Sequence, residues 1–160
     1  MVAVTIIAVG KLKEKFYRDA AAEYEKRLSR FCKLNILELK DEPTPDTPTE
    51  KERDAVLEKE GARILSKIPD SAYVIALCVE GSQRPSEKFA QLLEQAEIEG
   101  RGHIVFVIGG SLGLSAQVKN RANLRLSFSE MTFPHQLMRV ILLEQIYRGF
   151  QIRTGTQYHK

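Results

Sequence analysis

The chain has 160 residues, 43% of them hydrophobic, and a formal net charge of +3. A chain of this length is expected to form one domain, residues 1–160, which buries roughly 70% of the surface that its unfolded form exposes. The two cysteines, Cys32 and Cys78, lie in separate apolar runs without CxxC or Cys/His spacing, and the three histidines are far apart. This pattern argues against a disulfide framework and a metal site, and it predicts a reducing, cytoplasmic environment.

The N-terminal apolar run at 2–9 lacks the basic leader and cleavage site of an export signal. No run approaches the ~18 apolar residues of a membrane span, so neither export nor insertion is expected. Charge is unevenly placed, because residues 101–160 carry eight Lys and Arg against two Asp and Glu, while residues 1–100 carry −3. The basic part holds all three histidines and is suited to a polyanion such as RNA, unless the asymmetry is ordinary solvated surface charge.

Apolar runs alternate with helical patterns along the whole chain. Strands are expected at 2–9, 34–39, 73–79, 104–108 and 124–128, and helices at 14–31, 49–68, 85–99 and 135–151. Alternation of this kind, with continuously apolar strands, predicts an α/β fold with a mostly parallel sheet of about five strands and helices on both faces.

Local signals set several boundaries between these elements. Residues 40–48 contain three prolines and three acids, which predict an exposed loop. The following helix opens on a capping box, because Glu52 stands three residues after Thr49. The third strand is expected to end at a turn formed by Glu80 and Gly81.

The first and last helices have informative apolar patterns. In the first, Phe16, Ala20, Tyr24 and Leu28 recur at helical spacing and define an expected buried face. The last helix is apolar around most of its circumference, through Leu137, Met138, Val140, Ile141, Leu142, Leu143, Ile146, Tyr147 and Phe150. Such a helix is either a central core helix or shared with a second subunit, and the small size of the domain favours a homodimer.

Two apolar strands end in loops that carry the candidate site. The strand at 104–108 runs into GGSLG at 109–113, and the strand at 124–128 runs into SEMTFPH at 129–135. Ligands bind beyond the carboxyl ends of parallel strands, so these two loops are expected to converge on one cleft. The glycine loop matches neither GxGxxG nor GxxxxGKS/T, which argues against a dinucleotide or P-loop site.

The glycine loop also matches the GxSxG pattern of a hydrolase nucleophile. Ser111 follows an apolar strand and precedes a helix capped by Ser115, and Glu130 or Glu144 followed by His159 gives the chain order of a triad. The small number of strands favours Ser111 as a hydrogen-bonding turn residue, but a small serine hydrolase stays open as an alternative.

His135 opens the last helix directly after Pro134, and Arg139 follows one turn later. Residues four apart share a helix face, so a titratable ring and a fixed cation are expected to point into the same cleft. Capping or packing is the structural alternative for His135.

Three ordered motifs carry a resemblance that spans essentially the whole chain. They are FVIGGSLGL at 106–114, LSFSEMTFPHQLMR at 126–139 and the ending YHK at 158–160, together with VGKLK at 9–13 and KEG at 59–61. The chain thereby resembles the bacterial 23S rRNA pseudouridine N3-methyltransferases of the SPOUT class. This resemblance implies a C-terminal trefoil knot, dimerisation and S-adenosylmethionine as cofactor, bound by Leu77, Gly109, Phe128, Ser129, Glu130, Met131, Thr132 and Phe133.

The resemblance also implies a substrate, a pseudouridine of large-subunit RNA within the assembled ribosome. Its N3 is an imide nitrogen that becomes nucleophilic as its proton leaves, so the site needs a base or a stabilising cation. His135 and Arg139 are the expected catalytic residues, and Tyr158, His159 and Lys160 are expected to fold over the base. A non-catalytic RNA-binding factor of the ribosome is the remaining alternative.

Overall fold

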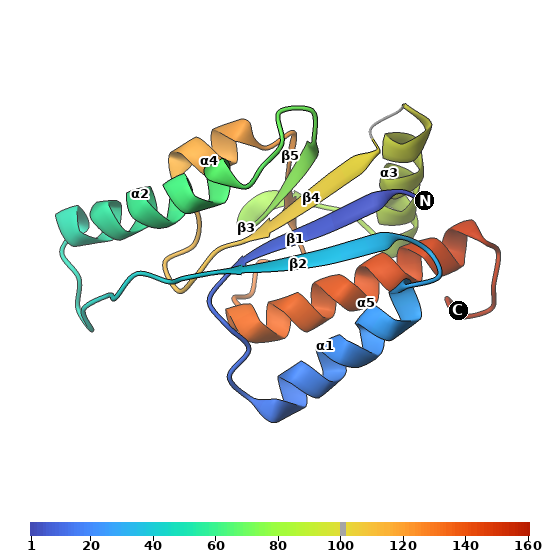
Figure 1. Ribbon diagram of the computed structural model, residues 1–160, viewed down its shortest axis with the longest axis horizontal. Helices are drawn as coiled ribbons and strands as arrows, with labels where there is room; N and C mark the ends of the chain where they lie inside the picture. Colours follow the sequence, from blue (N-terminus) through green and yellow to red (C-terminus); the bar gives the residue numbers. More distant parts are fainter. Residues whose placement is uncertain (100–101) are drawn as a thin grey trace.

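A parallel sheet forms the centre of the protein, of which the computed structural model describes residues 1–99 and 102–160 (Figure 1). Its strands are β1 (Ala3–Val9), β2 (Lys33–Leu39), β3 (Tyr73–Gln83), β4 (His103–Ile108) and β5 (Leu124–Ser127). They lie in the order β2-β1-β4-β3-β5, and every neighbouring pair is parallel. The predicted α/β fold with a five-stranded sheet is therefore confirmed.

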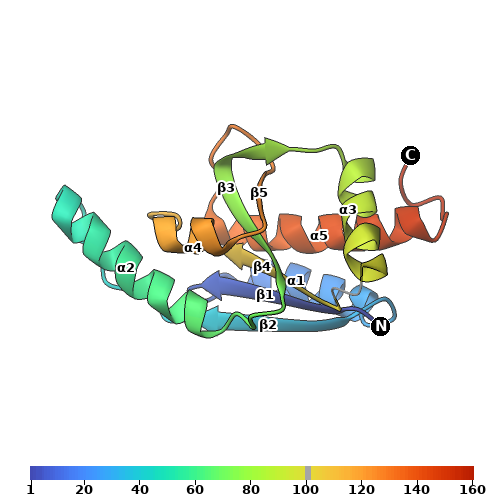
Figure 2. The same cartoon turned by 90° about the horizontal axis from the view of Figure 1, so that it is seen from above.

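Helices cover both faces of the sheet, as Figures 1 and 2 show from two directions. One face packs against α1 (Lys15–Leu28), α3 (Ser86–Ile98) and α5 (His135–Arg153). The other face packs against α2 (Glu50–Ser66) and α4 (Ala116–Arg121). The expected capping box opens α2, since the Glu52 amide donates to Thr49 Oγ1 at 3.1 Å and the Thr49 amide to Glu52 Oε1 at 3.2 Å.

Strand alternation divides the apolar residues between two cores. Ile6 and Phe106 face α1, α3 and α5, whereas their neighbours Ile7 and Val105 face α2 and α4, and all four are 0% exposed. Side chains of successive strand residues point to opposite faces, so a strand covered on both sides must be apolar throughout. The unbroken apolar runs of β1 and β4 follow from that requirement.

The first helix is shorter than predicted, and one of the four residues of its expected buried face is exposed. It spans Lys15–Leu28 rather than 14–31, and Ala21 and Leu28 are its buried residues. Leu28 is buried and Tyr24 packs against the core, as expected. Phe16, expected on the buried face, is 63% exposed. Spacing alone cannot tell whether the first turn of a helix reaches beyond the sheet that it covers, and here it does.

The third strand differs most from its prediction. It continues through the turn expected at 80–81, pairs with β4 only over residues 73–76, and shifts its register with β5 between Leu77 and Ser82. A register shift of this kind bends a strand away from one neighbour. The two strands β3 and β4 therefore separate toward their carboxyl ends.

The last helix lies in the layer formed with α1 and α3 (Figure 1). Leu142, Leu143 and Ile146 are 0% exposed, and a Cβ at Gly149 would stand 2.9 Å from Leu93 Cδ1 of α3. The glycine thus permits close packing of α5 against α3. A second apolar side of α5, formed by Leu137, Val140 and Ile141, stays half-buried in the single chain.

We predict that Ile146→Ala lowers the free energy of unfolding by about 2–5 kcal/mol, because it removes a fully buried side chain and leaves a cavity. Ile98→Ala is the matched control, since Ile98 is 71% exposed on α3 and its loss should change the free energy by less than about 0.5 kcal/mol. Denaturant unfolding of both variants measures the difference. Equal losses would contradict the placement of α5 in the core.

Candidate functional site

A cavity of about 640 Å³ opens at the carboxyl ends of the strands. Most of its lining comes from three segments: residues 77–80 of β3, residues 108–114 at the end of β4 and after it, and residues 126–135, without Glu130, from β5 to the start of α5. Lys119 and Met138 complete the lining. The separation of β3 from β4 makes the space, and the two strand-ending loops converge on it as expected. Its volume lies within the range of roughly 300–1,000 Å³ typical of small-molecule sites.

The first loop is a tight turn that requires glycine. Gly110 and Gly113 form an isolated bridge, the Gly113 amide donates to the Gly110 carbonyl at 3.1 Å, and Gly113 has φ +84°. A Cβ at Gly109 would stand 2.4 Å from the Gly113 carbonyl oxygen. Any side chain at 109 would therefore push the turn open, so the tight turn beside the cavity requires glycine at this position.

The second loop is held by its own serines and supplies apolar side chains. Ser127 Oγ donates to the Ser129 carbonyl at 3.0 Å, and the Met131 amide donates to Ser129 Oγ at 3.0 Å. Met131 is 74% exposed at the rim, and Glu130 does not line the cavity. The other residues predicted to contact the cofactor do line it: Leu77, Gly109, Phe128, Ser129, Met131, Thr132 and Phe133.

His135 lies at the inner end of this loop and lines the cavity. Its ring is close to the end of β1, where a Cβ at Gly10 would stand 3.6 Å from His135 Cε1. Burial lowers the pKa of His135 below its usual value, and the charges of Arg139 and Lys13 lower it further, while Asp41 acts in the opposite direction. The ring is therefore neutral near pH 7 and able to accept a proton.

Arg139 does not reach the cavity, although it lies one turn after His135. Its side chain is 4% exposed, and its guanidinium forms a 2.5 Å ion pair with Glu38 and donates to the Gly10 carbonyl at 3.0 Å. Nε is buried without a hydrogen-bond partner among the described residues. Both residues do share one side of α5, but the cation is directed to the ends of β1 and β2.

The C-terminal residues are docked on α5 away from the cavity of their own chain. Tyr158 OH donates to Glu144 Oε2 at 2.8 Å, and His159 Nε2 lies 2.7 Å from Glu87 Oε1 on α3. Burial and the Glu144 carboxylate raise the pKa of Tyr158 to about 12, so the phenol stays protonated. Glu144 stands nine residues after His135, about 14 Å along the helix at 1.5 Å per residue.

The positions of Glu144 and His159 argue against the serine hydrolase alternative. Ser111 lines the cavity, but His159 is bonded to Glu87 and Arg148, and Glu144 is bonded to Arg148 and Tyr158. The expected triad partners of Ser111 are therefore engaged elsewhere. The structure does not assemble a Ser-acid-His triad from these residues.

Sequence reasoning missed the polar wall of the cavity. Cys78, Val79, Glu80 and Lys119 line it, and Lys119 Nζ forms a 2.5 Å ion pair with a Glu80 oxygen. That lysine lowers the pKa of Glu80. The predicted strand at 73–79 already contained Cys78 and Val79, but no local pattern indicated that Glu80 and Lys119 would meet at the cavity.

Among residues 1–99 and 102–160, no three His, Cys, Asp or Glu side chains are grouped so as to hold a metal ion. No helix in the same ranges combines the length and apolar character needed to cross a bilayer.

The fold and the cavity define a parallel α/β protein with a cavity of small-molecule size beside a glycine turn. A family model described as a predicted SPOUT methyltransferase matches residues 2–159. The chain therefore belongs to the SPOUT methyltransferase family, and the resemblance found in its motifs is confirmed.

Individual relatives agree with this assignment. The chain is 59% identical over 157 residues to a ribosomal RNA large subunit methyltransferase H of Streptococcus thermophilus, covering 98% of this chain and 99% of the relative. It is 57% identical to the protein of the same name in Clostridium novyi, with the same coverage. A probable methylase family protein from Haemophilus influenzae Rd KW20 has the same fold, with a TM-score of 0.55 at 13% identity over 100% of this chain and 72% of the other.

We predict that the pKa of His135, followed by NMR titration of its ring protons, is below the usual value of about 6.5. Asp41→Asn removes a stabilising negative charge and should lower this pKa further, whereas Lys13→Ala should raise it. Because the unfolded chain takes up this proton at higher pH than the folded chain, stability should fall as pH decreases below about 6.5. Shifts of the same sign in both variants would contradict the assigned surroundings of the ring.

Proposed function

We propose that this protein transfers a methyl group from S-adenosylmethionine to N3 of a pseudouridine in large-subunit ribosomal RNA, on assembled ribosomes in the cytoplasm. One observation carries the proposal: relatives named ribosomal RNA large subunit methyltransferase H match 98% of the chain. The family model, which matches residues 2–159, spans every segment that lines the cavity. The identity of the base and of its reacting nitrogen comes from the motif resemblance described above.

The cavity suits such a methyl donor in size and in chemistry. S-adenosylmethionine supplies an electrophilic methyl group on a positively charged sulfur. Leu77, Phe128 and Phe133 offer apolar surface to the adenine and to the methionine chain, and the turn at 109–113 offers backbone groups to polar edges. The close approach of Gly109 to the Gly113 carbonyl keeps this turn tight beside the proposed donor site.

Proton removal from N3 falls to His135 in this proposal. The ring is neutral near pH 7, lines the donor cavity and therefore stands where a base is needed. Arg139 acts as a positioning residue, since it holds the Gly10 carbonyl beside the ring and contributes a positive charge that favours the neutral imidazole. We propose this role in place of direct contact with the substrate.

A homodimer completes the site in this proposal. Ile141, on the half-buried apolar side of α5, lines a second hollow of about 330 Å³ together with Phe128 and Phe133. Burial of this side by a second copy would remove apolar surface from water. The tail residues Tyr158, His159 and Lys160 would then act on the cavity of the partner, and the trefoil knot implied by the resemblance would order the loops around the donor.

Mass analysis of ribosomal RNA after incubation with the protein and labelled S-adenosylmethionine tests the proposal. We expect one methyl group on a pseudouridine of large-subunit RNA. Ser111→Ala should retain this activity within a few-fold, because Ser111 has no triad partner. Donor binding without transfer to any ribosomal RNA would instead favour a non-catalytic ribosome factor, and loss of an esterase activity in Ser111→Ala would favour the hydrolase.

We predict that deletion of residues 158–160 reduces RNA methylation at least tenfold, because the tail contacts the substrate rather than the donor. Calorimetric affinity for S-adenosylmethionine should stay unchanged, since none of these residues lines the cavity. Unchanged methylation would remove the tail from the proposed mechanism.

A mixing experiment tests whether the tail acts on the partner's cavity. His135→Gln with an intact tail and the tail-deleted protein with intact His135 should each be weakly active. If the tail acts across the dimer, mixing and exchanging subunits should restore methylation at the sites that combine His135 with the partner's tail. Absence of restoration, with subunit exchange demonstrated, would show that each tail serves its own chain.

A further inference from the structure

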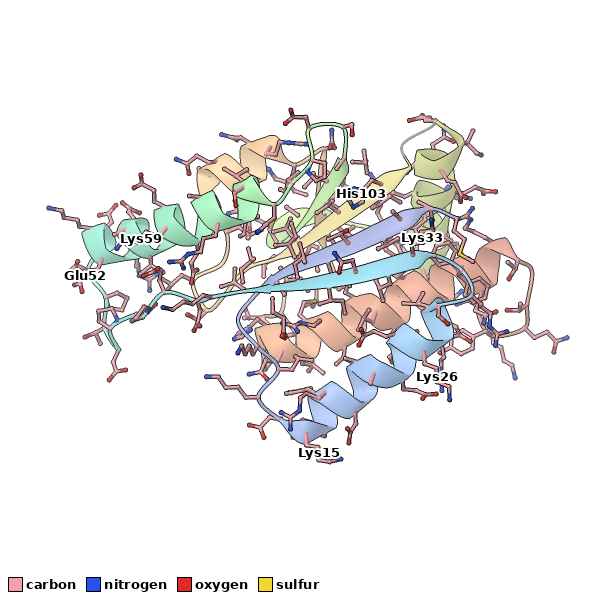
Figure 3. The ribbon with its side chains drawn as sticks, in the orientation of Figure 1. Lys15, Lys26, Lys33, Glu52, Lys59 and His103 are labelled. Carbon is pink, nitrogen blue, oxygen red and sulfur yellow. The ribbon has the colours of Figure 1, made fainter. Side chains whose placement is uncertain are left out.

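The segment between β1 and α1 presents a cluster of exposed basic and aromatic side chains. We call residues 11–18 the β1–α1 surface. Lys11, Lys13 and Lys15 are exposed, and Phe16 is 63% exposed with its ring centre 4.4 Å from that of Tyr17. In Figure 3 Lys15 stands at the free end of α1 and points away from the sheet. The exposed phenylalanine occupies a helix position that the sequence pattern assigns to the core.

The shape of this surface is fixed by hydrogen bonds to residues near the site. The Lys13 amide donates to Gln136 Oε1 at 2.8 Å, next to His135, and the Leu12 amide donates to Glu38 Oε2 at 3.3 Å. Arg18 Nη1 donates to the Lys13 carbonyl at 2.6 Å. The lysines and Phe16 are therefore carried on a preorganised loop that adjoins the first turn of α5.

The charges of this surface are available to a partner. Among the described residues, Lys11 and Lys13 form no ion pair, whereas Lys15 pairs with Asp19 at 2.6 Å in full exposure to solvent. Other exposed apolar side chains lack this setting: Ile98, 71% exposed, stands between Glu97 and Glu99. Unpaired lysines beside an exposed aromatic ring are the combination that single-stranded nucleic acid requires, since phosphates need cations and unstacked bases need a flat apolar face.

We infer that the β1–α1 surface binds the RNA strand next to the methylated nucleotide, with Lys11 and Lys13 on its phosphates and Phe16 stacked on an unpaired base. The inference rests on the proposed function for the identity of the RNA. Its position beside His135 places the contacted strand at the mouth of the cavity rather than on a remote face of the protein.

Co-sedimentation with ribosomes in the absence of any methyl donor tests the inference, using ribosomes from a strain that lacks this methyltransferase. The variants are Lys11→Ala with Lys13→Ala, Phe16→Ala, Phe16→Leu and Phe16→Tyr. Lys26→Ala with Lys33→Ala is the charge control, because these exposed lysines lie away from the start of α1 (Figure 3). Ile98→Ala is the control for loss of an exposed apolar side chain. All measurements are made at pH 8, where His135 is neutral in every variant.

The phosphate contacts and the stacking contact should change ribosome binding in different ways. Loss of two phosphate contacts should reduce the slope of log affinity against log salt by about 1.4 to 1.8. Phe16→Ala should weaken ribosome binding about tenfold, and Phe16→Leu should weaken it to the same extent, because stacking on a base needs the aromatic ring. Phe16→Tyr keeps the ring and should bind as tightly as the wild type. Both controls should stay within about twofold of the wild type, and thermal unfolding should be unchanged throughout.

Wild-type binding by both Phe16→Ala and the double lysine variant would overturn the inference, even if the protein methylates ribosomal RNA. Equal weakening by the double lysine variant and by the Lys26 and Lys33 control would also overturn it, because net charge alone would then explain the effect. Conversely, selective loss of ribosome binding in the variants, in a protein that transfers no methyl group, would support RNA binding by the β1–α1 surface and refute the proposed function.

Discussion

The separation of β3 from β4 is the constraint on which the candidate site depends. The two strands pair only over residues 73–76, and beyond them β3 follows β5 through a shift in register. Gly81 permits that path, because a Cβ there would stand 2.7 Å from the Arg125 carbonyl oxygen of β5. If β3 stayed paired with β4 beyond residue 76, backbone hydrogen bonds would join the two strands there. The cavity that residues 77–80 now line would then be closed.

A second set of contacts, at the ends of β1 and β2, fixes the position of α5 next to the cavity. The buried guanidinium of Arg139 joins α5 to β2 through Glu38 and to β1 through the Gly10 carbonyl. The same Glu38 carboxylate accepts the amide of Leu12, so the loop after β1 is fixed by the group that fixes α5. His135 and the β1–α1 surface thus share one frame, which would keep the proposed base and the proposed RNA contacts at constant separation.

Sequence patterns predicted the fold class and the two converging loops, since apolar alternation and glycine turns are local properties. They failed where the outcome depended on distant partners. The continuation of β3 past Glu80 depends on β5, some forty residues later, and the inward path of Arg139 depends on Glu38. Helical spacing placed Phe16 on a buried face, because the pattern does not say where the sheet beneath a helix ends.

The distribution of charge also could not be predicted from composition alone, because it depends on which side chains form ion pairs. The basic C-terminal part was expected to carry the cationic surface, yet several of its cations are neutralised by neighbours: Lys119 by Glu80, Arg139 by Glu38, Arg148 by Glu144 and Arg153 by Glu97. Ion pairs of this kind cancel much of the field that would attract a polyanion. Lys11 and Lys13, in the part of the chain with net negative charge, have no such partner among the described residues. The proposed attraction for RNA beside the cavity therefore rests on side chains whose charges are unpaired, and the net charge of a segment is a poor measure of it.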